Sequence, residues 1–256
     1  MKDSVQVEDT AMLQDVRLDI IYDNYPHPEG EITLWGFSCL IRNTQKTILF
    51  DAGDQGDSLM ANMAALGIDP KIIELVVISH DHADHTRGLG RLIPESQSPQ
   101  VILLESFSSE LKEQVKVLGG KVVENSKSVE ICPYVFTTGE MQGRATEQAL
   151  VLQTRGGLIV ITGCAHPGVV NIVKCAREML EGEILLVMGG FHLLQHSREA
   201  VNGIISELQD LSVKYVAPTH CTGDIPRQIF KDAYGDNFIE LEIGSTITLS
   251  DLMDEK

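Results

Sequence analysis

The sequence predicts an α+β protein with a four-layered αββα sandwich, in which helices cover the outer faces of two packed β-sheets. Each half of the chain contains runs of β-branched and apolar residues with the length of buried strands. Segments with helical spacing, several of them ending at glycine, separate these runs. Strands and helices interspersed in this way suggest two sheets with helices outside, whereas periodicity alone indicates only an α/β or α+β class. With 256 residues the chain can bury one large core, and we expect a single domain over residues 1–256.

The first half of the chain is expected to be rich in strands. Two segments in it have apolar residues at helical spacing and end at glycine, 58–67 and 108–120. The segment "NTQK" has the composition of a tight turn between two of the strands. The predicted strands are 16–23, 31–42, 46–53, 74–80 and 100–105.

The second half alternates more regularly. Short strands are expected near 121–138, and "EQALVLQT" and "LIVITG", separated by "RGG", read as a β-hairpin. The elements predicted after the hairpin are helix 168–180, strand 183–188, helix 197–211, strand 213–217, a short helix near 226–233 and two closing strands near 238–249.

Composition excludes several classes of function. The net charge of −17, from 20 basic and 37 acidic residues, repels nucleic-acid phosphates, and no cluster of lysine or arginine offsets it. A small anionic substrate held at a metal ion remains compatible with this charge. No apolar stretch has the length of a membrane span, and the first residues lack the pattern of a secretory signal. Five scattered cysteines favour a reduced, cytoplasmic protein over a disulfide framework.

Polar or glycine-rich segments follow several predicted strands, at the point where each strand ends. Four of these five segments contain histidine, and together they hold six of the eight histidines in the chain. Loops at one end of the strands of a sheet commonly form the active site. The five segments are "FDAG" (50–53), "SHDHADH" (79–85), "TGCAH" (162–166), "MGGFH" (188–192) and "APTHC" (217–221).

The segment "SHDHADH" has the pattern of a metal site. His80 and His82 are two residues apart, so on an extended chain they point the same way and can share one ion. Asp84 and His85 follow as the chain turns and can face a second position beside the first. Imidazole and carboxylate ligands suit Zn²⁺, Mn²⁺ or Fe²⁺ better than Ca²⁺. The alternative is a polar surface loop, but such a loop does not require matched polar groups at four further strand ends.

These motifs together resemble the metallo-β-lactamase superfamily. More narrowly, the chain is similar to the branch related to the archaeal 7,8-dihydropterin-6-methyl-4-(β-ribofuranosyl)aminobenzene-5′-phosphate synthase. The resemblance implies a metallo-β-lactamase-like αββα sandwich, a mono- or dinuclear metal site between the sheets and a metal-bound hydroxide. The segments that carry it run nearly from end to end: "YDN", "GFSCLI", "ILFDAG", "LGID", "SHDHADHTRGL", "LIVITGCAHPGVVNIV", "GGFHLL" and "PTHCTG".

The resemblance also implies roles for individual residues. His80 and His82 should bind a first metal ion, while Asp84 and His85 should bind a second, with His220 joining the set. Asp51 should lie behind the ligands and steer one histidine, since ligand imidazoles usually donate their free N–H to a carboxylate or carbonyl. The alternative for Asp51 is a turn-forming role.

Three positions depart from the superfamily pattern. No histidine lies between His85 and Cys164, so the usual third-site histidine is missing and His166 is its natural substitute. Cys164 stands where an aspartate usually bridges two metal ions; it either bridges as a thiolate or only packs, so the number of ions stays open. Trp35 stands where a histidine is expected before "GFS", and it is expected to reshape the pocket wall.

Other residues of the strand ends are candidates for catalysis or substrate binding. The place of His192 resembles that of a proton-shuttling histidine in related tRNA-processing nucleases, and an imidazole there can protonate a leaving group. The alternatives are a rim histidine or an extra ligand. Gly190 should let the backbone approach substrate, and Asn24 should line the pocket by resemblance. Cys221 follows the presumed ligand His220 and is expected to point away from it and pack, with metal binding as the alternative.

The leading functional prediction is a metal-dependent hydrolase. One or two divalent ions, zinc by preference with manganese or iron as alternatives, would activate a hydroxide that attacks a phosphoester or cyclic ester of a small molecule. Asp84 would orient the attacking water or briefly accept its proton, and His192 would protonate the leaving group. The second functional prediction is a transferase similar to dihydropteroate synthase. It would join a dihydropterin diphosphate to a ribofuranosylaminobenzene phosphate. A non-catalytic metal sensor is the third, which the nearly complete ligand set disfavours.

Overall fold

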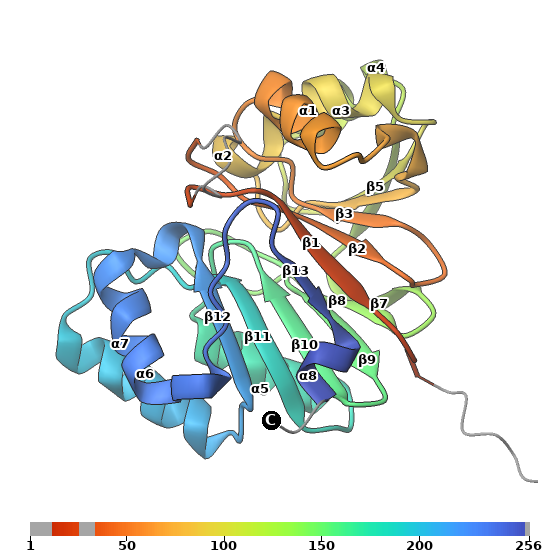
Figure 1. Ribbon diagram of the computed structural model, residues 1–256. Coiled ribbons are helices and arrows are strands. Elements are labelled where there is room, and N and C mark those ends of the chain that lie inside the picture. The colour runs from red at the N-terminus through yellow and green to blue at the C-terminus, as the bar shows by residue number, and fades with distance from the viewer. Residues whose placement is uncertain (1–11, 26–33, 254–256) are drawn as a thin grey trace, which may run out of the picture.

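The computed structural model describes residues 12–25 and 34–253 of the chain. These residues form two mixed β-sheets that pack face to face, with helices on both outer faces (Figure 1). The α+β class and the αββα sandwich predicted from the sequence are therefore confirmed. The start of the predicted strand 31–42 lies outside the described residues, and its observed strand begins at Ser38.

The first sheet has seven strands among the described residues, in the order β13-β1-β2-β3-β4-β5-β6. β3 to β6 pair in parallel, while β1, β2 and β3 pair antiparallel, so β1 runs in the direction of β3 and β4. The strands are β1 Arg17–Tyr22, β2 Ser38–Arg42, β3 Ile48–Phe50, β4 Leu75–Val77, β5 Gln100–Leu104, β6 Lys121–Asn125 and β13 Thr246–Thr248. The helices of this half are α1 Gly56–Ala65, α2 Ala83–Thr86, α3 Leu89–Glu95 and α4 Ser109–Val117, with a 3-10 turn η1 at Pro70–Ile72.

The second sheet has six strands among the described residues, in the order β12-β11-β10-β9-β8-β7. β10, β11 and β12 are parallel and the others antiparallel. The strands are β7 Lys127–Cys132, β8 Val135–Gly139, β9 Leu150–Thr154, β10 Gly157–Thr162, β11 Ile184–Gly190 and β12 Tyr215–Thr219. The helices are α5 Val169–Met179, α6 Arg198–Asp210, α7 Asp224–Tyr234 and α8 Leu249–Met253, with 3-10 turns η2 at His220–Thr222 and η3 at Gly235–Asn237.

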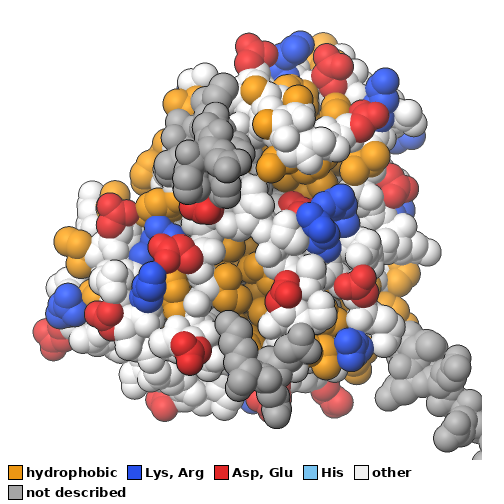
Figure 2. Space-filling model, in the orientation of Figure 1, with side chains coloured by type: hydrophobic (Ala, Val, Ile, Leu, Met, Phe, Trp, Pro, Cys, Tyr) orange, Lys and Arg blue, Asp and Glu red, His pale blue; other side chains and the backbone are white. Residues whose placement is uncertain are grey.

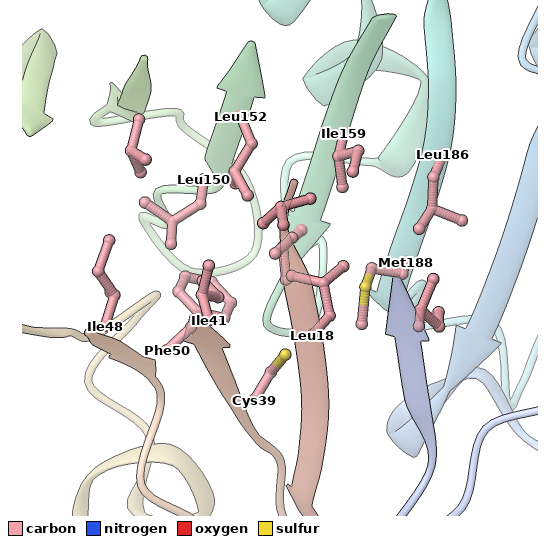
Figure 3. Packing of buried hydrophobic residues seen from close by; sticks show 14 of the residues in the cluster. Leu18, Cys39, Ile41, Ile48, Phe50, Leu150, Leu152, Ile159, Leu186 and Met188 are labelled. Atoms are coloured by element: carbon pink, nitrogen blue, oxygen red, sulfur yellow. The ribbon is translucent and has the colours of Figure 1, made fainter. Parts of the chain in front are cut away.

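The side chains of each central strand alternate between two cores. In β10, Ile159 and Ile161 face the other sheet, whereas Leu158 and Val160 face the helices. Figure 3 shows residues of both sheets meeting in the core between them, among them Leu18 and Met188. Because successive side chains of a strand point to opposite faces, a strand covered on both sides must be apolar throughout. This explains the continuous apolar runs in the sequence.

The structure differs from the predicted elements near the C-terminus. Only β13 forms a strand between residues 238 and 249 among the described residues, whereas the sequence predicts two. Phe238 bridges Val216 of the second sheet, and Thr246 pairs with Asp19 of the first. The intervening segment crosses from one sheet to the other, so it forms no ladder with either.

Charged side chains are distributed in small mixed groups on the face shown in Figure 2. Arg17 in β1 and Arg42 at the end of β2 both form ion pairs with Asp19. This face therefore presents no extended basic patch of the kind that binds nucleic acid.

The ends of strands from both sheets meet at one edge of the sandwich. The hydroxyl of Thr219, at the end of β12, donates to Asp23 after β1, and the Cys164 sulfur after β10 lies 3.3 Å from Nε2 of His85 after β4. Because β3 and β4, and β10 to β12, are parallel, their carboxyl ends bring several loops to the same place. The polar segments singled out in the sequence occupy these loops.

Candidate metal centre

The first group of potential ligands consists of His80, His82 and His166. One ring nitrogen of each lies within 4.8 Å of the others. The ring centroids are 4.6 Å apart for His80 and His82, 4.7 Å for His80 and His166, and 4.9 Å for His82 and His166. The first two follow β4 and the third follows β10 in the other sheet. The structure thus brings His166 to the pair where the sequence pattern lacked a third histidine.

The second group consists of Asp84, His85, Cys164 and His220. Nε2 of His85 lies 3.5 Å from Oδ2 of Asp84, and Nε2 of His220 lies 3.4 Å from the same oxygen. The Cys164 sulfur lies 3.3 Å from Nε2 of His85. The rings of His80 and His85 are 4.2 Å apart, so the two groups are direct neighbours.

Unpaired buried nitrogen atoms show that these residues fit a cation. Nε2 of His80, Nε2 of His220 and both ring nitrogens of His166 are buried without a hydrogen-bond partner among the described residues. A buried polar atom left unpaired in this way is costly, and buried polar groups are normally paired or coordinate metals. The donor set of imidazoles, one carboxylate and one thiol suits zinc, iron or manganese. These residues could therefore hold one or two divalent ions.

One carboxylate orients a histidine of each group. Oδ2 of Asp51 accepts a hydrogen bond from Nδ1 of His85 at 2.6 Å and another from the hydroxyl of Ser79 at 2.7 Å. Because the Ser79 hydroxyl donates to Asp51, its oxygen is free to accept from Nδ1 of His80, at 2.9 Å. Both imidazoles therefore carry their proton on Nδ1 and present Nε2 toward the other ligands. Asp51 thus holds two of the potential ligand histidines, one directly and one through Ser79.

Asn24 has the same relation to His220. Its side-chain oxygen accepts from Nδ1 of His220 at 3.0 Å, and its amide donates to the His220 carbonyl at 2.9 Å. The oxygen also accepts from the backbone of Gly36 at 3.1 Å. The sequence predicts a pocket-lining Asn24 that binds substrate, whereas both ends of its side chain are engaged by the protein. In this structure it orients a ligand.

Glu147 is a site residue that the sequence patterns missed. It is fully buried, and its Oε1 accepts from the backbone N–H groups of Gly163, Cys164 and Ala165 at 2.8–3.1 Å. Its Oε2 accepts from the backbone N–H of His166 at 2.8 Å. This carboxylate therefore holds the loop that carries one residue of each ligand group. The available signal was an acidic residue two positions before the apolar run that begins at Ala149.

Four of the loops have left-handed backbone at a residue other than glycine. The φ angles are 58° at Asp51, 58° at Ala165, 54° at His192 and 47° at His220. Such conformations cost about 1–3 kcal/mol each and persist only where surrounding structure holds them. Here the hydrogen bonds of Asp51, Asn24 and Glu147 supply part of that support.

Electrostatics favour the neutral form of two ligand imidazoles. Burial, together with His85, holds the pKa of His80 well below its ordinary value, and burial with His192 lowers the pKa of His166 to about 4. Burial acts to lower the pKa of His85 as well, but Asp51 outweighs it and raises the pKa to about 9. Metal binding at His85 would therefore displace a proton.

Two further strand-end residues differ from expectation. The sequence predicts that Cys221 points away from His220 and packs in preference to binding metal, whereas its sulfur, the Cys164 sulfur and a His192 nitrogen all lie within 4.8 Å of one another and form a third group of potential ligands. The 3-10 turn that follows β12 directs it inward. Gly190 is required by packing in this structure, because a Cβ there would lie 2.4 Å from the Gly163 oxygen and 2.7 Å from the Cys221 sulfur.

Comparison with known proteins agrees with this geometry. The family model of the metallo-beta-lactamase superfamily matches residues 36–177. The chain belongs to this superfamily.

A relative within the superfamily is 7,8-dihydropterin-6-methyl-4-(beta-D-ribofuranosyl)-aminobenzene-5'-phosphate synthase of Methanocaldococcus jannaschii. It is 29% identical over 248 residues, which cover 79% of this chain and 84% of the relative. A crystal structure of a metal-dependent hydrolase of the superfamily is also 29% identical, with a TM-score of 0.79 over 91% of this chain and 98% of that one. Human tRNase Z, short form, shares the fold at 13% identity, with a TM-score of 0.61 over 90% of this chain and 98% of that one. The chain is an enzyme of the superfamily, and both hydrolysis and group transfer occur among the names of its relatives.

His192 lies beside the candidate metal centre and belongs to neither the first nor the second group of potential ligands. Its ring centroid is 4.5 Å from that of His166, and its Nδ1 is buried without a hydrogen-bond partner among the described residues. The residue borders two adjoining cavities, of about 290 and 440 Å³. It is placed where a side chain can contact both a ligand histidine and a molecule in these cavities.

Proposed function

We propose that the enzyme is a metal-dependent hydrolase of a phosphoester or cyclic ester of a small anionic molecule. The observation that carries this proposal is the convergence of two groups of potential ligands, with buried unpaired nitrogens, beside cavities bordered by His192. Zinc is the metal that we propose, with manganese or iron as alternatives. A divalent ion bound by these residues would lower the pKa of water and polarise an oxygen of the substrate.

Asp84 is proposed to act on the attacking water. Its side chain is 21% exposed, whereas those of His85 and His220 are fully buried, so it is the ligand oxygen that faces solvent. Burial acts to raise the pKa of Asp84, but the adjacent His220 and the charge of His85 hold the pKa well below the usual range. A carboxylate in this position can orient a water molecule and accept its hydrogen bond.

His192 is proposed to protonate the leaving group. A departing alkoxide needs a proton, and an imidazole within hydrogen-bond reach can supply one at neutral pH. The left-handed backbone at His192 turns its side chain from the end of β11 toward His166 and the cavities. Asp51, Asn24 and Glu147 are proposed to act through the ligands, by holding their orientation.

The proposed partner is a small anionic molecule rather than a nucleic acid or membrane. The acidic net charge of −17 supports the first exclusion. No helix in the described part of the chain has the length and apolar character needed to cross a membrane. The cysteines of the described residues are unpaired, which supports a reducing compartment such as the cytoplasm.

Transfer without hydrolysis is a second candidate function, supported by the similarity to the methanogen synthase. In that reaction the site would hold a dihydropterin diphosphate while a ribofuranosylaminobenzene phosphate displaces the diphosphate. Water must then be kept from the reacting carbon, because it would compete with the aromatic acceptor.

Turnover in water labelled with ¹⁸O separates the two functions. The zinc-, manganese- and iron-loaded enzyme is incubated with aryl phosphates, lactones, or the pterin diphosphate with its acceptor, and products are analysed by mass spectrometry. Hydrolysis places ¹⁸O in the phosphate or acid product, while transfer yields an unlabelled condensed product. A His80→Ala, His166→Ala double variant controls for contaminating activity. If only the condensed product forms, the hydrolase proposal is wrong.

A further inference from the structure

The only tryptophan of the chain lies at the mouth of the candidate metal centre. Trp35 is 49% exposed, and its ring centroid lies 5.0 Å from that of His220. The next residue fixes its position: the Gly36 backbone donates to Asn24, and a Cβ on Gly36 would lie only 2.7 Å from the Asp84 carbonyl. Trp35 is therefore attached to backbone that packs directly on the second ligand group.

The backbone around Arg144 packs against His166 of the first ligand group, as that around Trp35 packs against the second. A Cβ on Gly143 would lie 2.3 Å from the His166 carbonyl oxygen, and the Arg144 backbone N–H donates to that oxygen at 3.4 Å. The guanidinium of Arg144 has no hydrogen bond or ion pair with another residue in the described ranges, although acidic residues outnumber basic ones by 37 to 20. An unpaired guanidinium at this place is available to an anion.

Trp35 and Arg144 line one cavity of about 440 Å³ with His192. Leu194, 58% exposed, adds a second apolar surface to it. Ser197, the N-cap of the 13-residue helix α6, also lines the cavity, so a helix N-terminus lies at its wall. Arg144 and His192 also line the adjoining 290 Å³ cavity together with His166. The cavity thus combines flat apolar surface with a cation beside the potential ligands.

We propose that this cavity binds an aryl phosphate, with the aromatic ring against Trp35 and the phosphate between Arg144 and the metal centre. This inference deepens the proposed function and rests on it. A planar ring gains stacking energy on an indole, while a phosphate accepts paired hydrogen bonds from a guanidinium. A cavity of this size accommodates a ring system of one or two rings. An unpaired arginine also offsets, at this one place, the repulsion of anions by the acidic chain.

The single tryptophan makes the test specific to this cavity. The zinc-loaded, full-length enzyme is titrated with phenylphosphonate, whose C–P bond resists hydrolysis, and tryptophan emission is recorded. Cyclohexylphosphonate is the matched control, because it has the same charge and similar volume without a flat ring. We expect phenylphosphonate to bind about 2- to 10-fold more tightly, the ratio expected for one aromatic contact. Benzyl alcohol, which lacks the anion, should not saturate at comparable concentration.

Variants assign the two contacts. Arg144→Ala should weaken phenylphosphonate binding about 10- to 100-fold, as for the loss of a charge-assisted hydrogen bond, with Arg144→Lys intermediate. Arg155→Ala is the matched control, because Arg155 lies in the turn before β10, at the opposite end of that strand. Trp35→Leu, measured by calorimetry, should bind phenyl- and cyclohexylphosphonate with equal affinity.

Equal binding of the two phosphonates by the wild-type enzyme would overturn the role of Trp35, and unchanged affinity in Arg144→Ala would overturn the role of Arg144. Neither measurement depends on turnover. Specific binding of phenylphosphonate by an enzyme that hydrolyses no ester would contradict the proposed function and leave the aryl phosphate site intact. Hydrolysis of small esters without any preference for flat anions would support the proposed function and contradict the aryl phosphate site.

Discussion

Oε2 of Glu147 accepts a hydrogen bond from the backbone N–H of His166 at 2.8 Å. His166 lies in the loop that connects β10 to α5. Oε1 of the same carboxylate accepts three more from the residues before it. Burial raises the pKa of Glu147 to about 7, against the opposing effect of the N–H groups of His166, Ala165 and Cys164 and of the charge of His85. A side chain that precedes β9 thereby positions a potential ligand that follows β10.

Glu147→Gln should destabilise the protein and weaken metal binding. Glutamine replaces one acceptor oxygen with a donor, so at least one buried backbone N–H loses its partner, at a cost of about 1–3 kcal/mol in the free energy of unfolding. Urea denaturation and metal analysis after dialysis measure the two effects. The exposed Glu113→Gln is the control. Wild-type stability and metal content in Glu147→Gln would show that the loop does not depend on the carboxylate.

His166→Ala and His220→Ala should impair different metal positions. His166 belongs to the group with His80 and His82, and His220 to the group with Asp84 and His85. If two ions bind, each variant should lose about one equivalent and the double variant both, measured by mass spectrometry of bound metal. His196→Ala, at an exposed histidine, should retain the wild-type content. A His166→Ala variant with full metal content would contradict its assignment.

Cys164→Asp should raise occupancy of the second metal position. The Cys164 sulfur lies 3.3 Å from His85, and an aspartate there would present a carboxylate oxygen, a harder and charged ligand. The readout is the stoichiometry of a zinc titration, with Cys164→Ser as the neutral control of similar size. An unchanged second binding step would mean that this residue does not face the ion.

Asp84→Asn should lose metal affinity and turnover together. The carboxylate contacts both His85 and His220 and is the anionic oxygen ligand of its group. The loss of affinity should exceed the roughly 10–100-fold effect typical of residues behind the ligands. Isothermal titration with zinc and steady-state kinetics on one preparation test this. Retained metal with lost turnover would restrict Asp84 to proton chemistry.

His192→Ala should keep metal content and lower turnover by about 10²–10⁴-fold, the range for general acid catalysis. The loss should shrink for substrates whose leaving groups are already acidic, because such groups depart without a proton. A series of aryl phosphates of graded leaving-group pKa measures this dependence. An equal loss across the series would assign His192 to binding, and loss of metal would make it a ligand, together with Cys164 and Cys221.

Local patterns account for most of the predicted fold. Buried strands such as β10 and β11 were recognisable because apolar residues fill both of their faces. The short helix α3 escaped prediction because Gly90 and Pro94 lie within it and obscure the helical spacing. The segment after α7 was misread because the buried residues Leu241 and Ile243 alternate with a less buried residue, which resembles the pattern of a strand.

The sequence by itself determined the αββα class and the segment "SHDHADH", whose spacing places ligands for two adjacent positions within a single turn of chain. Only the tertiary structure decided which distant groups complete them. Glu147 reaches His166 and Asn24 reaches His220 across 19 and 196 residues, and Cys221 turns toward Cys164. Such contacts depend on how two sheets align their strand ends and on left-handed backbone at single residues. Neither produces a periodic pattern in the sequence, because the side chains involved lie in loops and turns that are distant from one another along the chain.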